Sequence, residues 1–166
     1  MKTKQLILTA LLFVVALYAN AQSNDEKPFK FGVGALIGLP VGYVSSYTNL
    51  AYGFDVLSEY TVAPTFGVTL SVGYVDFVKK SGFSGFKTGL IPILIGGKYY
   101  FSDMLYASAQ VGLSLSTQSE GGSAFTFAPG IGYKISKNFD LLLKYQSASK
   151  NGGNSSLFGL RAGLSF

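Results

Sequence analysis

The residues of this chain that could do chemistry are carboxylates, lysines, an arginine and amides, because it contains neither histidine nor cysteine. Without those two residue types, a Ser-His-Asp triad, a Cys-His pair and an ordinary zinc site are excluded. The loop carboxylates Asp76 and Glu120 lie far apart in the sequence, and neither has an acidic partner at a spacing that suits glycoside hydrolysis. We therefore expect a protein that is not an enzyme and that binds no cofactor or metal.

Segments in which large apolar residues alternate with small or polar ones follow one another along the chain. In the clearest, 105–116, Leu105, Val111 and Leu113 share one parity, whereas Tyr106, Ser108 and Gln110 share the other. Side chains of a strand point alternately to opposite faces, so each segment has one apolar face. This period predicts eight strands, at 29–39, 50–60, 66–75, 88–100, 105–116, 125–135, 139–147 and 156–166.

The connections between these strands alternate in length. Longer connections rich in Ser, Gly, Asn and Lys are expected at 40–49, 76–87, 117–124 and 148–155, and tight turns at 61–65, 101–104 and 136–138. Long outer loops, short periplasmic turns and an even strand number are typical of outer-membrane barrels. The sequence therefore predicts an all-β fold, an eight-stranded antiparallel up-and-down transmembrane β-barrel.

The volume of such a barrel indicates which face points outward. An eight-stranded barrel has an interior just wide enough for side chains or one small ligand. The large apolar residues exceed that volume, whereas the opposite parity is mostly Gly, Ala, Ser and Thr, so we expect the apolar parity to face lipid. A soluble, lipocalin-like ligand-binding barrel is the less favoured alternative. Pro92 and Pro129 fall inside strands, where we expect a bulge or local irregularity.

The inward parity carries the candidate site, a set of charged and polar residues within the barrel. Three acids and four bases in a narrow interior should form ion pairs, since an isolated charge there would be unfavourable. A network that fills the barrel and fixes its register is favoured over a polar lumen that selects a solute. The predicted interior residues are Asp55, Glu59, Lys98, Gln110, Lys134, Asp140, Lys144 and Arg161.

The N-terminus has the pattern of a secretory signal peptide. Lys2 and Lys4 precede an apolar stretch that is too short to span a bilayer, and Ala19 and Ala21 form a small-residue site with cleavage before Gln22. We therefore predict a signal peptide at 1–21, a short polar segment at 22–28 and the barrel at 29–166. Cleavage lowers Lys+Arg from 13 to 11 against 8 acidic residues, a mild excess that does not indicate nucleic-acid binding.

A family resemblance is carried by the segment from Ile91 to Phe101, by the strand from Tyr106 to Gly112 that follows a short turn, and by the terminal Phe166. These residues resemble the outer membrane protein beta-barrel domain family of Gram-negative bacteria, with an architecture similar to small barrels of the OmpA and OmpX type. The resemblance implies that Phe166 is a signal read by the outer-membrane barrel assembly machinery. It implies no catalytic residues and, since nothing follows Phe166, no periplasmic domain.

The sequence thus predicts an integral protein of the outer membrane, surrounded by lipid and monomeric. The favoured function is non-enzymatic: a contribution to envelope integrity, or a surface interaction through the extracellular loops, whose partner the sequence does not specify. Binding or slow passage of a small solute or lipid through a narrow polar lumen is the alternative.

Overall fold

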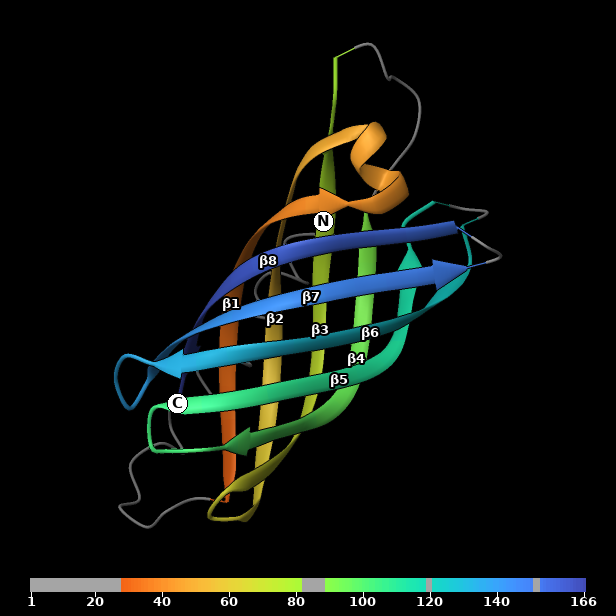
Figure 1. Ribbon diagram of the computed structural model, residues 1–166. Coiled ribbons are helices and arrows are strands. Elements are labelled where there is room, and N and C mark those ends of the chain that lie inside the picture. Colours follow the sequence, from red (N-terminus) through yellow and green to blue (C-terminus); the bar gives the residue numbers. More distant parts are fainter. Residues whose placement is uncertain (1–27, 82–88, 119–120, 151–152) are drawn as a thin grey trace, which may run out of the picture.

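The computed structural model describes residues 28–81, 89–118, 121–150 and 153–166, and these form one closed barrel (Figure 1). The predicted signal peptide, its cleavage site at Ala19, Ala21 and Gln22, and nearly all of the polar segment lie outside the described residues. The strands are β1 Phe29–Val41, β2 Thr48–Ala63, β3 Phe66–Lys79, β4 Leu90–Tyr100, β5 Leu105–Ser116, β6 Ser123–Lys134, β7 Phe139–Lys150 and β8 Gly153–Ser165.

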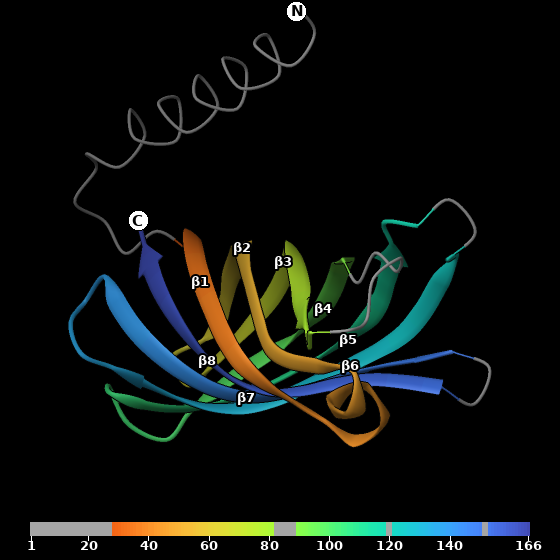
Figure 2. The same ribbon diagram turned by 90° about the horizontal axis from the view of Figure 1, so that it is seen from above.

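Each strand pairs antiparallel with its neighbours in the sequence, and β8 returns to pair with β1. This seam runs from Gly32 opposite Ser165 to Val41 opposite Ser156, and both views show the two strands side by side (Figures 1 and 2). It is extended by the Phe166 amide, which donates to the Phe31 carbonyl at 2.7 Å. Closure leaves no sheet edge, as a barrel that spans lipid requires. The predicted eight-stranded up-and-down barrel is confirmed.

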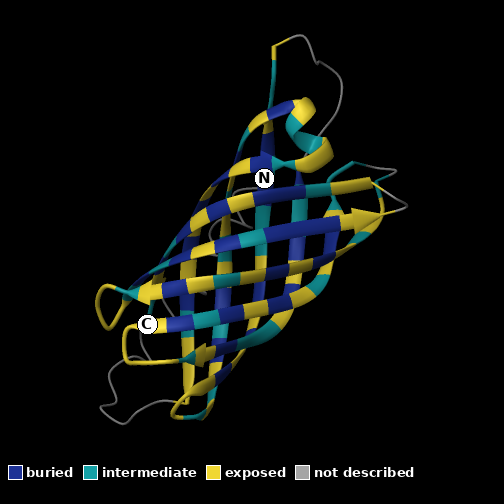
Figure 3. Ribbon diagram, viewed as in Figure 1, coloured by how far each residue is buried: buried dark blue, intermediate teal, exposed yellow. Residues whose placement is uncertain are grey.

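Buried and exposed residues alternate along the strands (Figure 3). In β1, Ile37 is 56% exposed, whereas its neighbour Leu36 is 5% exposed. The exposed parity carries the large apolar residues, and the buried parity carries mostly small or polar ones. The apolar parity therefore points outward, as predicted, because the narrow interior cannot hold it.

Outward aromatic residues gather at both ends of the barrel. At the end that carries residues 28 and 166, the Phe29 and Tyr60 rings lie 5.6 Å apart, centroid to centroid. At the opposite end, the exposed rings of Tyr43 and Tyr47 lie 5.3 Å apart. Such girdles are typical of the two interfaces of a membrane-spanning barrel. We call the end with residues 28 and 166 and the connections 64–65, 101–104 and 135–138 the turn end, and the opposite end the loop end.

The connection predicted at 148–155 is much shorter than expected. β7 continues to Lys150 and β8 begins at Gly153, with Ser149 paired to Asn154. The Ser- and Asn-rich composition suggested a loop, but backbone pairing supports polar residues in an exposed hairpin equally well. The connection between β1 and β2 holds a short 3-10 helix, η1 Gly42–Ser46. Among the described residues, no helix has the length and apolar character needed to cross a membrane.

The prolines interrupt pairing without shifting it. Pairing of β3 with β4 stops at Val72–Ile93 and resumes in the same register at Val75–Leu90, next to Pro92. Pairing of β6 with β7 is interrupted in the same way next to Pro129. A residue in an antiparallel strand directs both its N–H and its C=O to the same neighbouring strand. A proline therefore weakens the hydrogen-bond ladder with one neighbour only. The expected irregularity is present but the bulge is not, and the register shifts among the described pairs lie between β2 and β3.

The effect of a charge on the outward face should depend on how deep in the membrane it lies. Replacing Val111, an exposed residue near the middle of β5, with Lys should lower the free energy of unfolding by about 2–4 kcal/mol, because the ammonium would enter hydrocarbon. The matched change Leu105→Lys, at the turn end of the same strand, should lower it by about 0–1 kcal/mol. Urea titration in lipid vesicles, followed by far-UV circular dichroism, measures both. Equal losses of stability in the two variants would contradict the prediction that Val111 lies deeper in the membrane than Leu105.

Candidate functional site in the barrel interior

The structure places all eight predicted interior residues on the inward parity of the strands. Six are buried, and Asp55 and Lys134 are half-buried. They come from β2, β4, β5, β6, β7 and β8, so local sequence does not bring them together. Closure of the barrel does.

Arg161, on β8, is the centre of the network. Its Nε donates to both carboxylate oxygens of Asp55, at 3.0 and 2.8 Å, and its Nη2 donates to Oδ1 at 2.6 Å. Its Nη1 lies 3.7 Å from Oδ1 of Asp140, on β7. Arg161 is 4% exposed. Hydrogen bonds between ionised groups, such as these, are stronger than hydrogen bonds between neutral groups. One cation thus joins three strands across the interior.

A second cluster lies nearer the turn end and is built around Glu59. Lys98 Nζ donates to Glu59 Oε2 at 3.0 Å, and the Tyr100 hydroxyl donates to Oε1 at 2.5 Å. Lys134 Nζ lies 4.0 Å from the centroid of the Tyr100 ring, a cation–π contact that takes the place of a carboxylate partner.

Tyr106 connects the two clusters. It is fully buried, its hydroxyl donates to Asp140, and its ring lies 4.9 Å from Lys98 Nζ and 5.5 Å from the Tyr100 ring. Neither Tyr100 nor Tyr106 was among the predicted site residues. The signal was available in the sequence, because both are tyrosines on an inward row of small and polar residues, where a phenol needs a hydrogen-bond partner.

Inward glycines make room for this network. A Cβ added to Gly34 would overlap the Arg161 guanidinium, and one added to Gly132 would overlap the Tyr106 ring. A Cβ on Gly67 would lie 2.7 Å from Glu59 Oε1. The large polar side chains therefore depend on the absence of a side chain on the neighbouring strand.

Beneath η1, the loop end of the interior carries an apolar cluster, which the sequence did not lead us to expect; elsewhere on that side the buried hydroxyls of Ser114 and Thr126 are hydrogen-bonded to each other. Leu36, Ala51, Val75, Phe77 and Leu157 form a buried cluster, which we call the apolar plug, with Val44 of η1 and Leu90 packed against it. Four of the five plug residues lie on inward rows of the predicted strands, so parity could have found them. Phe77 lies beyond the predicted end of its strand at residue 75.

The helix that covers the plug is held in place by hydrogen bonds to its neighbours. The Thr48 hydroxyl donates to the Val44 carbonyl at 2.7 Å, and Lys80 Nζ donates to the Ser45 carbonyl at 2.8 Å. The Lys80 amide also donates to the Tyr47 carbonyl at 2.9 Å. Val44 is therefore fixed over the loop end of the interior.

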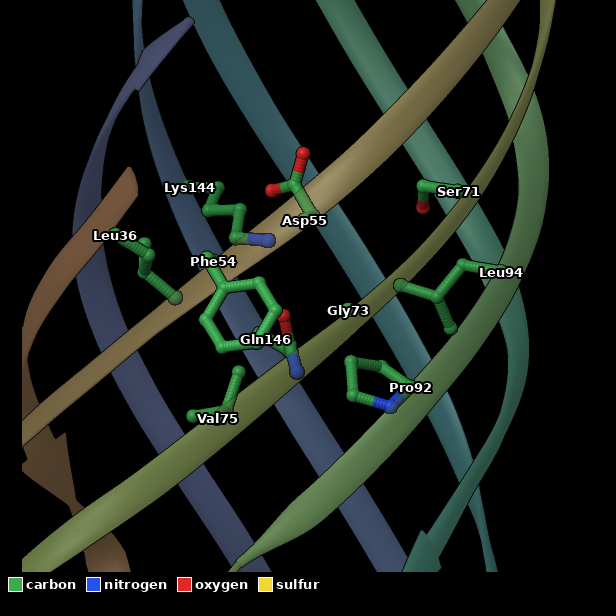
Figure 4. Close-up of a pocket in the computed structure, with 10 residues that line it drawn as sticks. All are labelled: Leu36, Phe54, Asp55, Ser71, Gly73, Val75, Pro92, Leu94, Lys144 and Gln146. Atoms are coloured by element: carbon green, nitrogen blue, oxygen red, sulfur yellow. The ribbon is translucent and has the colours of Figure 1, made fainter. Parts of the chain in front are cut away.

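The remaining predicted residues have different surroundings. Gln110 Nε2 donates to the hydroxyls of Thr69 and Ser71, at 3.2 and 3.1 Å. Lys144 is buried beside a small cavity between the network and the plug (Figure 4). Phe166 lies on the outer surface next to the β1–β8 seam. Across the described part of the chain, no three His, Cys, Asp or Glu side chains gather in a way that could hold a metal.

Chemically, this arrangement holds charges in place. Asp55, Glu59 and Asp140 each accept hydrogen bonds from a cation or a phenol, so their oxygens are occupied by protein donors. The network can fill the interior and fix the strand register.

Comparison with known proteins places this geometry among membrane barrels. A family model described as "Outer membrane protein beta-barrel domain" matches residues 7–166. A search of curated proteins found no match to this chain.

Among solved structures, the N-terminal β-barrel domain of OprF from Pseudomonas aeruginosa is similar, with a TM-score of 0.56 and 14% identity over 84% of this chain and 98% of that one. Ail, the attachment invasion locus protein of Yersinia pestis, gives 0.53 and 17%, over 83% and 96%. A de novo designed transmembrane β-barrel gives 0.56 and 16%, over 86% and 99%. At these identities the likeness concerns the fold alone.

Removing the central cation should destabilise the barrel. Arg161→Met leaves Asp55 and Asp140 inside the barrel without their cation, so we expect the free energy of unfolding to fall by about 3–5 kcal/mol. Urea titration in detergent micelles, followed by circular dichroism, measures the loss.

The matched control removes the orphaned charges as well. The triple variant Arg161→Met, Asp55→Asn, Asp140→Asn should recover most of the stability, because no unpaired carboxylate then remains inside the barrel. A triple variant as unstable as the single one would show that the loss comes from packing, not from charge.

Proposed function

The chain belongs to the outer membrane protein beta-barrel domain family, and from this premise we propose that it is a non-enzymatic barrel that supports envelope integrity or presents its extracellular loops to the exterior. It is an integral β-barrel of the outer membrane, so its outward apolar rows are in contact with lipid.

The observation that carries this proposal is the filled interior. The ionic network occupies the turn end and middle of the barrel, and the apolar plug occupies the loop end beneath η1. Water and ions would have to displace paired charges and then pass the apolar plug. Both features support a structural role over passage of a small solute or lipid.

The state of the polar groups supports a non-enzymatic role. A general acid or base must reach the substrate, whereas the interior carboxylates here are bonded to Arg161, Lys98 and tyrosine hydroxyls. The large apolar side chains lie outside the barrel, which argues against a soluble ligand-binding barrel. The outward rows are apolar on every strand, which supports a monomer surrounded by lipid.

Phe166 is the residue we propose to be read by the outer-membrane barrel assembly machinery. Its ring is exposed on the outer surface, and its backbone extends the seam that closes the barrel. The loop-end connections, 42–47, 80–89, 117–122 and 151–152, would then face the exterior, where a partner would bind.

Channel recording tests the structural role. We expect no conductance steps from the purified wild-type barrel in planar bilayers, and none from Arg161→Ala, because the apolar plug remains in both. Heat-modifiable gel mobility verifies that each sample is folded, and a sixteen-stranded porin serves as the conducting control. Steps from the wild type would favour the passage of solutes instead.

The mature N-terminus tests the signal peptide. Intact mass measurement of protein extracted from the outer membrane should give a chain that begins at Gln22, because the Ala19 and Ala21 site matches signal-peptidase preference. Replacing Ala21 with a bulky residue such as Leu should leave the precursor uncleaved. A wild-type mass that includes residues 1–21 would contradict the proposal.

A further inference from the structure

A small cavity lies inside the barrel, between the ionic network and the apolar plug. Its volume is about 10 Å³, the room that one water molecule needs. Asp55 of the network and Leu36 and Val75 of the plug all contribute to its walls. Lys144 and Gln146, two residues apart on β7, line it as well (Figure 4).

Two buried polar groups at this cavity have no partner among the described residues. Lys144 is 8% exposed, and its amine makes no hydrogen bond or ion pair within the described parts of the chain. Gln146 is 2% exposed, and its Oε1 is the buried side-chain atom for which the described residues supply no donor. Leaving such groups unsatisfied is unfavourable, most of all for a charge.

Asp55 and Ser71, which also line the cavity, bond neither Lys144 nor Gln146 directly. Asp55 accepts hydrogen bonds from Arg161 and the Ser71 hydroxyl accepts one from Gln110, but Oδ2 of Asp55 and the Ser71 oxygen each keep a lone pair. Pro92, on the opposite wall, has no N–H to donate. The cavity also lies where the β3–β4 and β6–β7 ladders are interrupted, at Gly73 and Pro92 on one wall and Gln146 on the other.

We propose that this cavity is a binding site for a single water molecule that bridges Lys144 and Gln146. The water accepts a hydrogen bond from the Lys144 ammonium and donates one to Gln146 Oε1. Its second hydrogen points to the Asp55 carboxylate or the Ser71 hydroxyl, which also line the cavity and can accept it. Three partners are the usual number for a buried water. The site satisfies both orphaned groups at once.

Leu36 and Val75 of the plug bound the cavity, so the proposed water lies against apolar side chains. It solvates a buried cation at mid-height of the barrel.

A high-resolution crystal structure of the folded wild-type barrel tests the site directly. We expect solvent density within hydrogen-bonding distance of both Lys144 Nζ and Gln146 Oε1, and no anomalous peak at that place after a bromide soak. A cavity without density, in which Lys144 bonds directly to Asp55, would overturn the proposal. So would a bromide peak, which would make the ligand an anion.

A double-mutant cycle tests the bridge in solution. Gln146→Leu should raise the unfolding equilibrium constant about tenfold in the wild type, because the water loses its acceptor. In a Lys144→Met background the same change should raise it no more than about twofold, since a water without the ammonium no longer holds its place. The matched background is Lys98→Met, because the Lys98 amine bonds Glu59 outside the cavity; there the tenfold effect of Gln146→Leu should persist. A tenfold effect in the Lys144→Met background as well would rule out the bridging water.

Discussion

The narrow interior of a closed eight-stranded barrel is the constraint on which the rest of this structure depends. Closure is imposed by lipid, which offers no hydrogen bonds to a free strand edge, and pairing of β8 with β1 removes that edge. Once the strand number is eight, the enclosed volume admits side chains but no open channel. The large apolar residues must then face outward, and whatever faces inward must be small or must be given room by its neighbours.

The interior meets this constraint by pairing large side chains with glycines. Arg161, Glu59 and Tyr106 each occupy the space over a glycine of a neighbouring strand. Their charges are then satisfied by one another, so that Arg161 ties β8 to β2 and β7, and Lys98 ties β4 to β2. An ion pair inside a protein is weak evidence for stability, but it is well suited to fixing register, because a shifted strand would leave a charge unpaired.

The two ends of the interior differ in kind. Near the turn end the side chains are ionic and aromatic, and beneath η1 they are apolar. The ionic network and the apolar plug together fill much of the interior. The proposed function therefore concerns the loops and the envelope around the barrel.

Alternation with period two is a local property of extended backbone, so the eight strands, the outward apolar rows and the inward placement of Asp55, Lys98 and Arg161 could be predicted from the sequence. Which of these residues meet depends on how the strands pair and close. Arg161 reaches both Asp55 and Asp140 because register and closure bring β2, β7 and β8 around one point, and those depend on all strands together. Local composition also misjudged the β7–β8 connection, where backbone pairing of Ser149 with Asn154 extends a hairpin through residues typical of loops. Parity can be read one strand at a time, whereas contacts across a barrel exist only when it has closed.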